Sequence, residues 1–360
     1  MARRAPLIFG KETIAAGTSL STALNLPGQS SYTPVAMPLQ IIHGRHNGPS
    51  VFVCAAIHGD EINGIEIIRQ LLLQKSLKRL KGTLYCIPVV NVYGFQNRTR
   101  YLPDGRDLNR AFPGSERGSL AARMAYVFRK EIISRCDYGI DLHTGSNHRT
   151  NFPHIRANMD DPETARLAHA FNTAVMVNAN LRDGSLRSYA VEKGIPVLLY
   201  EAGEALRFDK QPIQGGIRGI LNVLGALGMI KRNIKKQPHP SMETQSSHWV
   251  RAEKTGMIRH PVKLGTAVKA GDLLAMLADL LGQEETGVYA QRDGVVIGRT
   301  NLPTVNEGDA LFHVGEFKVS KKTATTVEKF EESIETLSQV RGEGLGEGDY
   351  VEHEVEESYN

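Results

Sequence analysis

Short hydrophobic segments alternate with amphipathic segments over residues 51–204, and this alternation constrains the fold more than any other feature. Residues 51–59 form an apolar run that ends in glycine, which is typical of a buried strand. The next segment repeats isoleucine and leucine at helical spacing and predicts a helix that begins near Asp60 or Glu61. Further strands are expected within 82–94, 138–145 and 189–204, with helices at 119–133 and 161–172. This order predicts an α/β layer with a mostly parallel sheet.

Three potential metal ligands stand where predicted strands end. His58 and Glu61 follow the first strand, and His143 ends the strand in IDLHTG. Because ligands bind beyond the carboxyl ends of strands in open α/β sheets, we expect these side chains to converge. Two imidazoles and one carboxylate form the open arrangement of catalytic zinc, which lowers the pKa of water to about 7. We therefore predict one zinc ion per subunit at these residues.

Carboxylates near these ligands have further expected roles. Asp141 precedes His143 by two residues, so both side chains should lie on one side of the strand, where Asp141 could orient the imidazole. Glu201 lies at the end of an apolar strand. A desolvated carboxylate there could act as a general base and then as an acid to the leaving amine. Glu204 is the competing candidate, and nothing in the local sequence separates the two.

A polar loop after the second strand is rich in arginine. It holds Arg98, Arg100, Arg106, Asn109 and Arg110. Guanidinium groups bind carboxylates in a bidentate manner, so the loop is expected to recognise a carboxylate. One arginine could also polarise the carbonyl of the scissile bond and stabilise the charge that develops on its oxygen.

The sequence changes character after residue 232. Residues 233–245 lack apolar periodicity and predict a linker between a first domain at 1–232 and a second at 246–317. The second domain has short strands and glycine turns, with VKAGDLL echoed by VNEGDAL, and it resembles a biotinyl/lipoyl-like β barrel-sandwich. The lysine that would carry a prosthetic group is not evident between the halves, so a carrier function is not expected. Residues 318–360 form an acidic tail that we expect to be partly disordered.

Charge and cysteine content narrow the classes of partner. The net charge of +4 divides into −8 for residues 322–360 and +12 for the rest, which is compatible with an anionic substrate. This balance does not by itself indicate nucleic acid or a membrane. Three widely spaced cysteines, no signal-peptide hydrophobic region and no run of 18 apolar residues predict a soluble cytoplasmic protein. A homo-oligomer is compatible with these features.

As a set, four motifs resemble the succinylglutamate desuccinylase/aspartoacylase family, whose members are relatives of the zinc carboxypeptidases. The motifs are HGDE at 58–61, the arginine loop that ends in Asn-Arg at 109–110, DLH at 141–143 and E-x-G at 201–203. The resemblance covers roughly residues 35–317. It implies a three-layer α/β/α, zinc-carboxypeptidase-like core with a mixed sheet, and a zinc-dependent hydrolase that acts on small N-acyl amino acids.

The resemblance also implies roles for the dispersed polar residues. The zinc ligands of the family match His58, Glu61 and His143, and its general base matches Glu201. A carboxypeptidase that removes C-terminal residues from peptides is an alternative, because the same site would serve it. An inactive binding or scaffold homologue is a second alternative, against which the complete set of four donors argues.

The arginine loop matches the family in two places. Arg100 matches the arginine that polarises the carbonyl, and the length of the following segment leaves Arg106 as an alternative. Asn109 and Arg110 match the pair that holds a substrate carboxylate. The identities of the acyl group and the amine do not follow from these motifs.

Overall fold

A computed structural model describes most of the chain. It covers residues 4–27, 34–179, 182–232, 241–244 and 246–317, together with residue 329. The predicted acidic tail at 318–360 therefore lies outside the described residues, apart from residue 329, as does most of the predicted linker.

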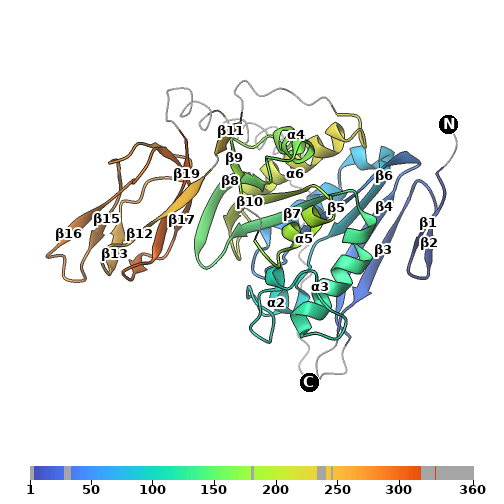
Figure 1. Cartoon of the computed structure of the whole chain (residues 1–360), viewed down its shortest axis with the longest axis horizontal. Helices are drawn as coiled ribbons and strands as arrows, with labels where there is room; N and C mark the ends of the chain where they lie inside the picture. The colour runs from blue at the N-terminus through green and yellow to red at the C-terminus, as the bar shows by residue number, and fades with distance from the viewer. Residues whose placement is uncertain are drawn as a thin grey trace, which may run out of the picture.

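One large mixed sheet runs through the described part of the molecule (Figure 1). Its core strands are β3 (Thr18–Asn25), β4 (Ala36–His43), β5 (His46–Ala55), β6 (Lys81–Ile87), β7 (Tyr138–Gly145), β8 (Arg149–Ala157), β9 (Val175–Asn178) and β10 (Val197–Glu204). The central strands β10, β7, β5 and β6 are parallel, whereas β8 and β4 run antiparallel to their neighbours β10 and β6. The α/β architecture predicted from the sequence is confirmed.

Helices pack on both faces of this sheet. One group comprises α1 (Asn63–Leu72), α4 (Pro162–Phe171) and α6 (Lys210–Ala226), and the other includes α3 (Leu120–Glu131) and α5 (Leu186–Glu192). Successive residues of a strand point to opposite faces, so Val53 packs in the first group's cluster and Phe52 in the second group's. Burial on both faces explains why the second half of β5, residues 51–55, is a continuous apolar run.

The strand expected at 51–59 is β5, which begins and ends earlier, at His46 and Ala55. Two further predicted element boundaries are wrong. The first helix begins at Asn63 and not near Asp60 or Glu61, because the N–H of Glu61 bonds to the carbonyl of His58 in a turn (3.1 Å). The strand expected within 82–94 ends with β6, and helix α2 (Val92–Gln96) follows after the side chain of Asn91 caps its N-terminus. Both departures leave polar residues in turns at the carboxyl edge of the sheet.

The C-terminal region, residues 246–317, is built from short strands and lies at the left of Figure 1. Its strands are β12 (Ser247–Arg251), β13 (Gly256–Arg259), β14 (Ala267–Val268), β15 (Leu273–Ala278), β16 (Glu285–Tyr289), β17 (Gly294–Thr300), β18 (Thr304–Val305) and β19 (Ala310–Glu316). Strands β16, β15, β13 and β18 form a separate sheet. Strands β12, β19 and β17 instead continue the large sheet, because β17 pairs with β8.

Short strands complete the edges of the molecule. Strands β1 (Leu7–Phe9) and β2 (Glu12–Ile14) form an N-terminal hairpin. Strand β11 (Met242–Thr244) lies within the predicted linker and pairs with β9 in parallel. The division into domains at 1–232 and 246–317 stays a prediction. In the structure, β8 connects the two regions, because it pairs with β10 in the first and with β17 in the second.

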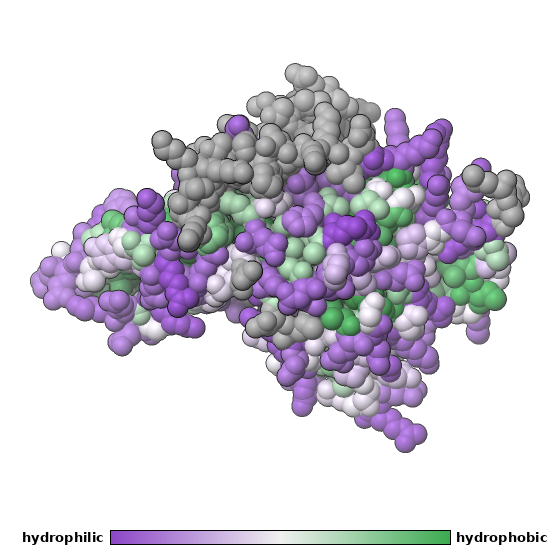
Figure 2. All heavy atoms as spheres, turned by 45° about the horizontal axis from the view of Figure 1, so that its top comes forward, coloured by the Kyte–Doolittle hydropathy of each residue, from purple (hydrophilic) through white to green (hydrophobic). Residues whose placement is uncertain are grey.

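The face of the molecule drawn in Figure 2 carries mostly polar side chains. Figure 2 shows hydrophilic residues over most of the coloured part of one face, with hydrophobic residues in small groups. Among the described helices, none combines the length and the hydrophobicity needed to cross a lipid bilayer.

Candidate metal centre and active site

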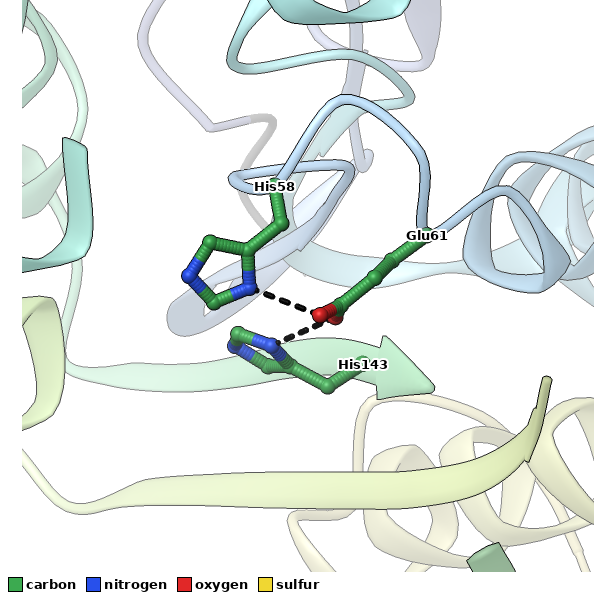
Figure 3. Close-up of side chains that lie close together, drawn as sticks. All are labelled: His58, Glu61 and His143. Carbon is green, nitrogen blue, oxygen red and sulfur yellow. Dashed lines mark hydrogen bonds and ion pairs between the residues drawn. The ribbon is translucent and has the colours of Figure 1, made fainter. Parts of the chain in front are cut away.

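His58, Glu61 and His143 meet at one point in the structure (Figure 3). Nδ1 of His58 lies 2.8 Å from Oε1 of Glu61, and Nδ1 of His143 lies 2.9 Å from Oε2 of the same carboxylate. One potential ligand atom from each residue lies within 4.8 Å of the others, and all three residues are buried. The structure thus brings together the three side chains that the sequence places at strand ends.

Neighbouring parallel strands and a close backbone approach create this convergence. His143 belongs to β7, which pairs with β5, and His58 lies in the loop that follows β5. Gly59 lets this loop approach α2, because a Cβ atom at position 59 would lie 2.0 Å from the backbone carbonyl carbon of Gly94. A larger residue at Gly59 would displace the turn that presents Glu61.

Each imidazole has a second carboxylate on its outer nitrogen. Oδ2 of Asp141 lies 2.9 Å from Nε2 of His143, and Oδ1 of Asp107 lies 3.1 Å from Nε2 of His58. Metal-binding histidines usually donate their other N–H to such a partner, which fixes the tautomer and the ring orientation. The sequence predicts the contact of Asp141 but not that of Asp107, which lies in the polar loop beside the Asn-Arg motif.

The donor set requires a positive charge between the ligands. When each outer Nε2 donates its proton to a carboxylate, Nδ1 of the neutral ring carries a lone pair. These lone pairs face the oxygens of Glu61, which are also acceptors, so a proton or a metal cation must lie between them. Two imidazole nitrogens and a carboxylate oxygen suit a divalent transition metal. The residues present therefore fit a metal ion.

Neighbouring charges also shift the pKa values of His143 and Glu61. Burial opposes the charged form of His143, but Asp141 and Glu61 outweigh it and raise the pKa of the ring well above its usual value. Burial likewise opposes ionisation of Glu61, but the two imidazoles lower the pKa of this carboxyl far below its usual value. The centre therefore favours an ionised carboxylate between two positively polarised rings.

The structure separates the two candidate arginines of the polar loop. Arg100 lies at the centre, with one guanidinium nitrogen 3.3 Å from Oε1 of Glu61 and the other 2.8 Å from Oδ2 of Asp107. Its side chain is 15% exposed, whereas that of Arg106 is 58% exposed and pairs with Asp104. Only Arg100 is therefore placed next to a proposed metal ligand.

Asn109 and Arg110 lie at the end of the same loop. The side-chain oxygen of Asn109 accepts a hydrogen bond from the N–H of Leu186 at the start of α5 (2.9 Å). This contact leaves the amide nitrogen of Asn109 as the group that can donate to a ligand. Arg110 is exposed and donates to the carbonyl of Asn109, and Arg98 is exposed near the start of the loop.

Glu201 lies beside the metal centre on β10, directly opposite His143 of β7. Its Oε2 accepts a hydrogen bond from the side chain of Asn151 (2.8 Å). Burial raises the pKa of the Glu201 carboxyl, and His143 opposes this shift. Glu204 lies further along the strand, opposite Gly145. The structure thus places Glu201, rather than Glu204, next to a proposed ligand.

Strand β8 adds side chains that the sequence does not predict as part of the site. His154 lies opposite Glu201, and its Nδ1 donates to the carbonyl of Phe152 (2.6 Å). Burial lowers the pKa of His154 to about 3, so the ring is neutral near pH 7. Burial also lowers the pKa of Arg156, and the charge of Glu201 opposes this shift.

Comparison with known proteins identifies the family. The sequence model of the succinylglutamate desuccinylase/aspartoacylase catalytic domain matches residues 47–227. This chain belongs to the succinylglutamate desuccinylase/aspartoacylase family. The resemblance inferred from the four motifs is therefore confirmed.

Two relatives within this family have named activities. An N-alpha-acetyl-L-2,4-diaminobutyric acid deacetylase from Halomonas elongata is 28% identical over 302 residues, which cover 80% of this chain and 88% of that protein. A succinylglutamate desuccinylase from Photorhabdus laumondii subsp. laumondii is 28% identical over 225 residues, which cover 55% of this chain and 68% of that protein. By these names, both relatives remove acyl groups.

Solved structures of this family share the fold. The product-bound ectoine utilization protein EutE (DoeB) from Ruegeria pomeroyi has a TM-score of 0.76 and 25% identity, and the match covers 83% of this chain and 95% of that one. A succinylglutamate desuccinylase/aspartoacylase from Rhodobacter sphaeroides has a TM-score of 0.73 and 25% identity, with 84% and 96% covered. The likeness therefore extends beyond the residues that the catalytic-domain model matches.

Proposed function

We propose that this protein is a zinc-dependent deacylase that hydrolyses the amide bond of an N-acyl amino acid or a related small amide bearing a carboxylate. The observation that carries this proposal is the buried cluster of His58, Glu61 and His143 with Glu201 on the next strand. Membership of the family and the acyl-removing activities named for the two relatives support it.

His58, Glu61 and His143 would hold one zinc ion per subunit. A bound zinc ion would polarise a carbonyl and lower the pKa of a water molecule to about 7. The ligand types favour zinc, although cobalt, nickel or manganese would suit the same donors.

Glu201 moves the proton in the proposed reaction. It takes a proton from the attacking water and then passes it to the leaving nitrogen, so the amide yields a carboxylic acid and a free amine. A carboxylate whose pKa is raised by burial binds the proton more readily than an exposed one and is better matched to this exchange. Asn151 holds Oε2, which leaves Oε1 to carry the proton.

Arginine and asparagine side chains orient the substrate. Arg100 would stabilise the negative charge on the carbonyl oxygen, and its contact with Glu61 supports this assignment over Arg106. Asn109 and Arg110 would hold a substrate carboxylate through the free amide nitrogen and the exposed guanidinium. This clamp fixes which amide bond lies over Glu201.

We also propose that the chain is divided into two domains. Residues 1–232 would form a three-layer, carboxypeptidase-like core, which the helices on both faces of the sheet support. Residues 246–317 would form a biotinyl/lipoyl-like barrel-sandwich, which the small four-stranded sheet beside β12, β19 and β17 supports. We propose a cytoplasmic enzyme that acts on small molecules, without a nucleic-acid or membrane partner.

A substrate panel with metal analysis tests the proposed function. The purified full chain is loaded with zinc and incubated with N-acetyl, N-succinyl and N-aspartyl amino acids and with short peptides, and release of free amine is measured. We expect hydrolysis of N-acyl amino acids that is absent from His143→Ala. Faster release of C-terminal residues from peptides would instead indicate the carboxypeptidase, and bound zinc without any hydrolysis would indicate the inactive homologue.

A further inference from the structure

Asn151 connects the proposed base to the C-terminal region. Its side-chain nitrogen donates a 2.8 Å hydrogen bond to Oε2 of Glu201. Its backbone pairs with Gly203 of β10 on one side and with Gly298 of β17 on the other. One residue of β8 therefore lies between the strand that carries the base and a strand of the C-terminal region.

Gly298 leaves the space that the Asn151 amide occupies. A Cβ atom at position 298 would lie 2.9 Å from Oδ1 of Asn151 and 3.2 Å from Cβ of His313. Non-bonded contacts of carbon are favourable near about 3.5–4.0 Å, so the Asn151 amide would have to move. Because Gly298 has no side chain, the Asn151 amide has room to lie where it donates to Glu201.

On its other side, Gly298 faces the Cβ atom of a histidine whose ring is held in place. His313 lies opposite Gly298 on β19 and is buried. Its Nε2 lies 2.9 Å from Oγ of Ser247, and its ring stacks on Trp249 with centroids 4.6 Å apart and an angle of 8°. Because the stacked rings hold His313 in place, an atom added at position 298 would displace the amide of Asn151 instead.

We propose that Asn151 and Gly298 are positioning residues for the Glu201 carboxylate. Asn151 fixes Oε2, and Gly298 keeps the amide of Asn151 in the orientation that donates to it. The C-terminal region thereby assists proton transfer without touching a reacting atom. This inference rests on the hydrolase function proposed above.

Steady-state kinetics of the full chain test this inference on the N-acyl amino acid that the wild type hydrolyses fastest. In Asn151→Ala we expect kcat to fall about 10- to 100-fold and KM to stay within about twofold, because a hydrogen bond to a charged group is lost. In Gly298→Ala we expect kcat to fall about 3- to 10-fold, because the added methyl group displaces the Asn151 amide and weakens its hydrogen bond to Glu201. Gly315→Ala on β19 is the matched control, since a Cβ atom there would make only ordinary contacts from 3.4 Å outward.

A double variant separates positioning from general damage to the sheet. Once Asn151 is alanine, the amide oxygen is gone, so adding Gly298→Ala should lower kcat no further. Asn151→Asp keeps the shape of the side chain but places a second carboxylate against Glu201, so its kcat should fall at least as far as in the alanine variant. Metal content and melting temperature should match the wild type in every variant.

Several results would overturn the inference. Wild-type kcat in Asn151→Ala or Asn151→Asp would do so, and so would a Gly298→Ala effect that persists undiminished in the double variant. A rise in KM with unchanged kcat would also contradict a positioning role for the base. A wild-type protein that hydrolyses no N-acyl amino acid would instead overturn the proposed function, before any variant is compared.

Discussion

The metal side and the base side of the candidate site are held in different ways. On the metal side, charged partners surround the ligands, with Asp107 and Asp141 on the outer nitrogens of the imidazoles and Arg100 on Glu61. On the base side, the neutral amide of Asn151 donates a hydrogen bond to Glu201, and the charge of Arg156 also acts on this carboxylate. We therefore expect changes on the metal side to weaken metal binding, and changes on the base side to affect turnover alone.

The largest effect is expected from loss of a ligand on the metal side. His143→Ala should abolish both metal binding and hydrolysis, with turnover at least about 10⁴-fold lower, because it removes a donor that no neighbour can replace. Elemental analysis and amine release measure the two properties. The exposed His169→Ala is the control and should behave as wild type. A His143→Ala protein that keeps stoichiometric metal would remove this residue from the centre.

Loss of the base should separate turnover from metal binding. In Glu201→Gln we expect kcat to fall about 10²- to 10⁴-fold while the metal content stays at the wild-type value, since only the proton acceptor is lost. Glu204→Gln is the matched variant on the same strand and should stay near the wild-type rate. A near-normal rate in Glu201→Gln would show that the base assignment is wrong.

Weakening an outer carboxylate should have an intermediate effect. Asp141→Asn keeps the shape of the side chain but removes the charge beside Nε2 of His143, so metal affinity should fall about 10- to 100-fold. Competition with a chelator of known affinity measures the change. Asp107→Asn tests the other imidazole in the same way. Unchanged affinity in both variants would contradict the view that charged partners brace the metal side.

The smallest effect is expected in the substrate clamp. Arg110→Ala should raise KM about tenfold and leave kcat within about threefold, because a charge-assisted hydrogen bond to the substrate carboxylate is lost. Arg106→Ala is the control, since its exposed side chain pairs with Asp104 and should leave KM unchanged. An unchanged KM in Arg110→Ala would exclude it from the clamp.

The metal side could be predicted from the sequence because local features define it. His58 and His143 each stand at the end of a hydrophobic strand, and strand ends in a parallel sheet converge on one edge. The strand expected within 138–145 is present as β7. The spacing of Asp141 and His143 also encodes their contact, because alternate residues of a strand share a face.

On the base side, Glu201 is expected from its place at the end of an apolar strand. The side chains around it could not be predicted, because their contacts are between distant segments. Strand β8 contains Pro153 and has an arginine near each end, so its sequence lacks the alternation of a typical strand. Its place in the sheet depends on pairing with β10 and β17, which lie far along the chain. The sequence around Asn151 and Gly298 therefore gives no sign of their contacts. The contact of Asp107 with His58 is not predicted either, because the two residues are 49 positions apart.

Metal stoichiometry of the full chain tests the central claim most directly. The protein is stripped with a chelator and dialysed against zinc, and bound metal is counted by elemental analysis for the wild type and for His58→Ala. We expect one zinc ion per chain in the wild type and none in the variant. A wild-type chain that binds no divalent metal, or a variant that binds as much as the wild type, would contradict it.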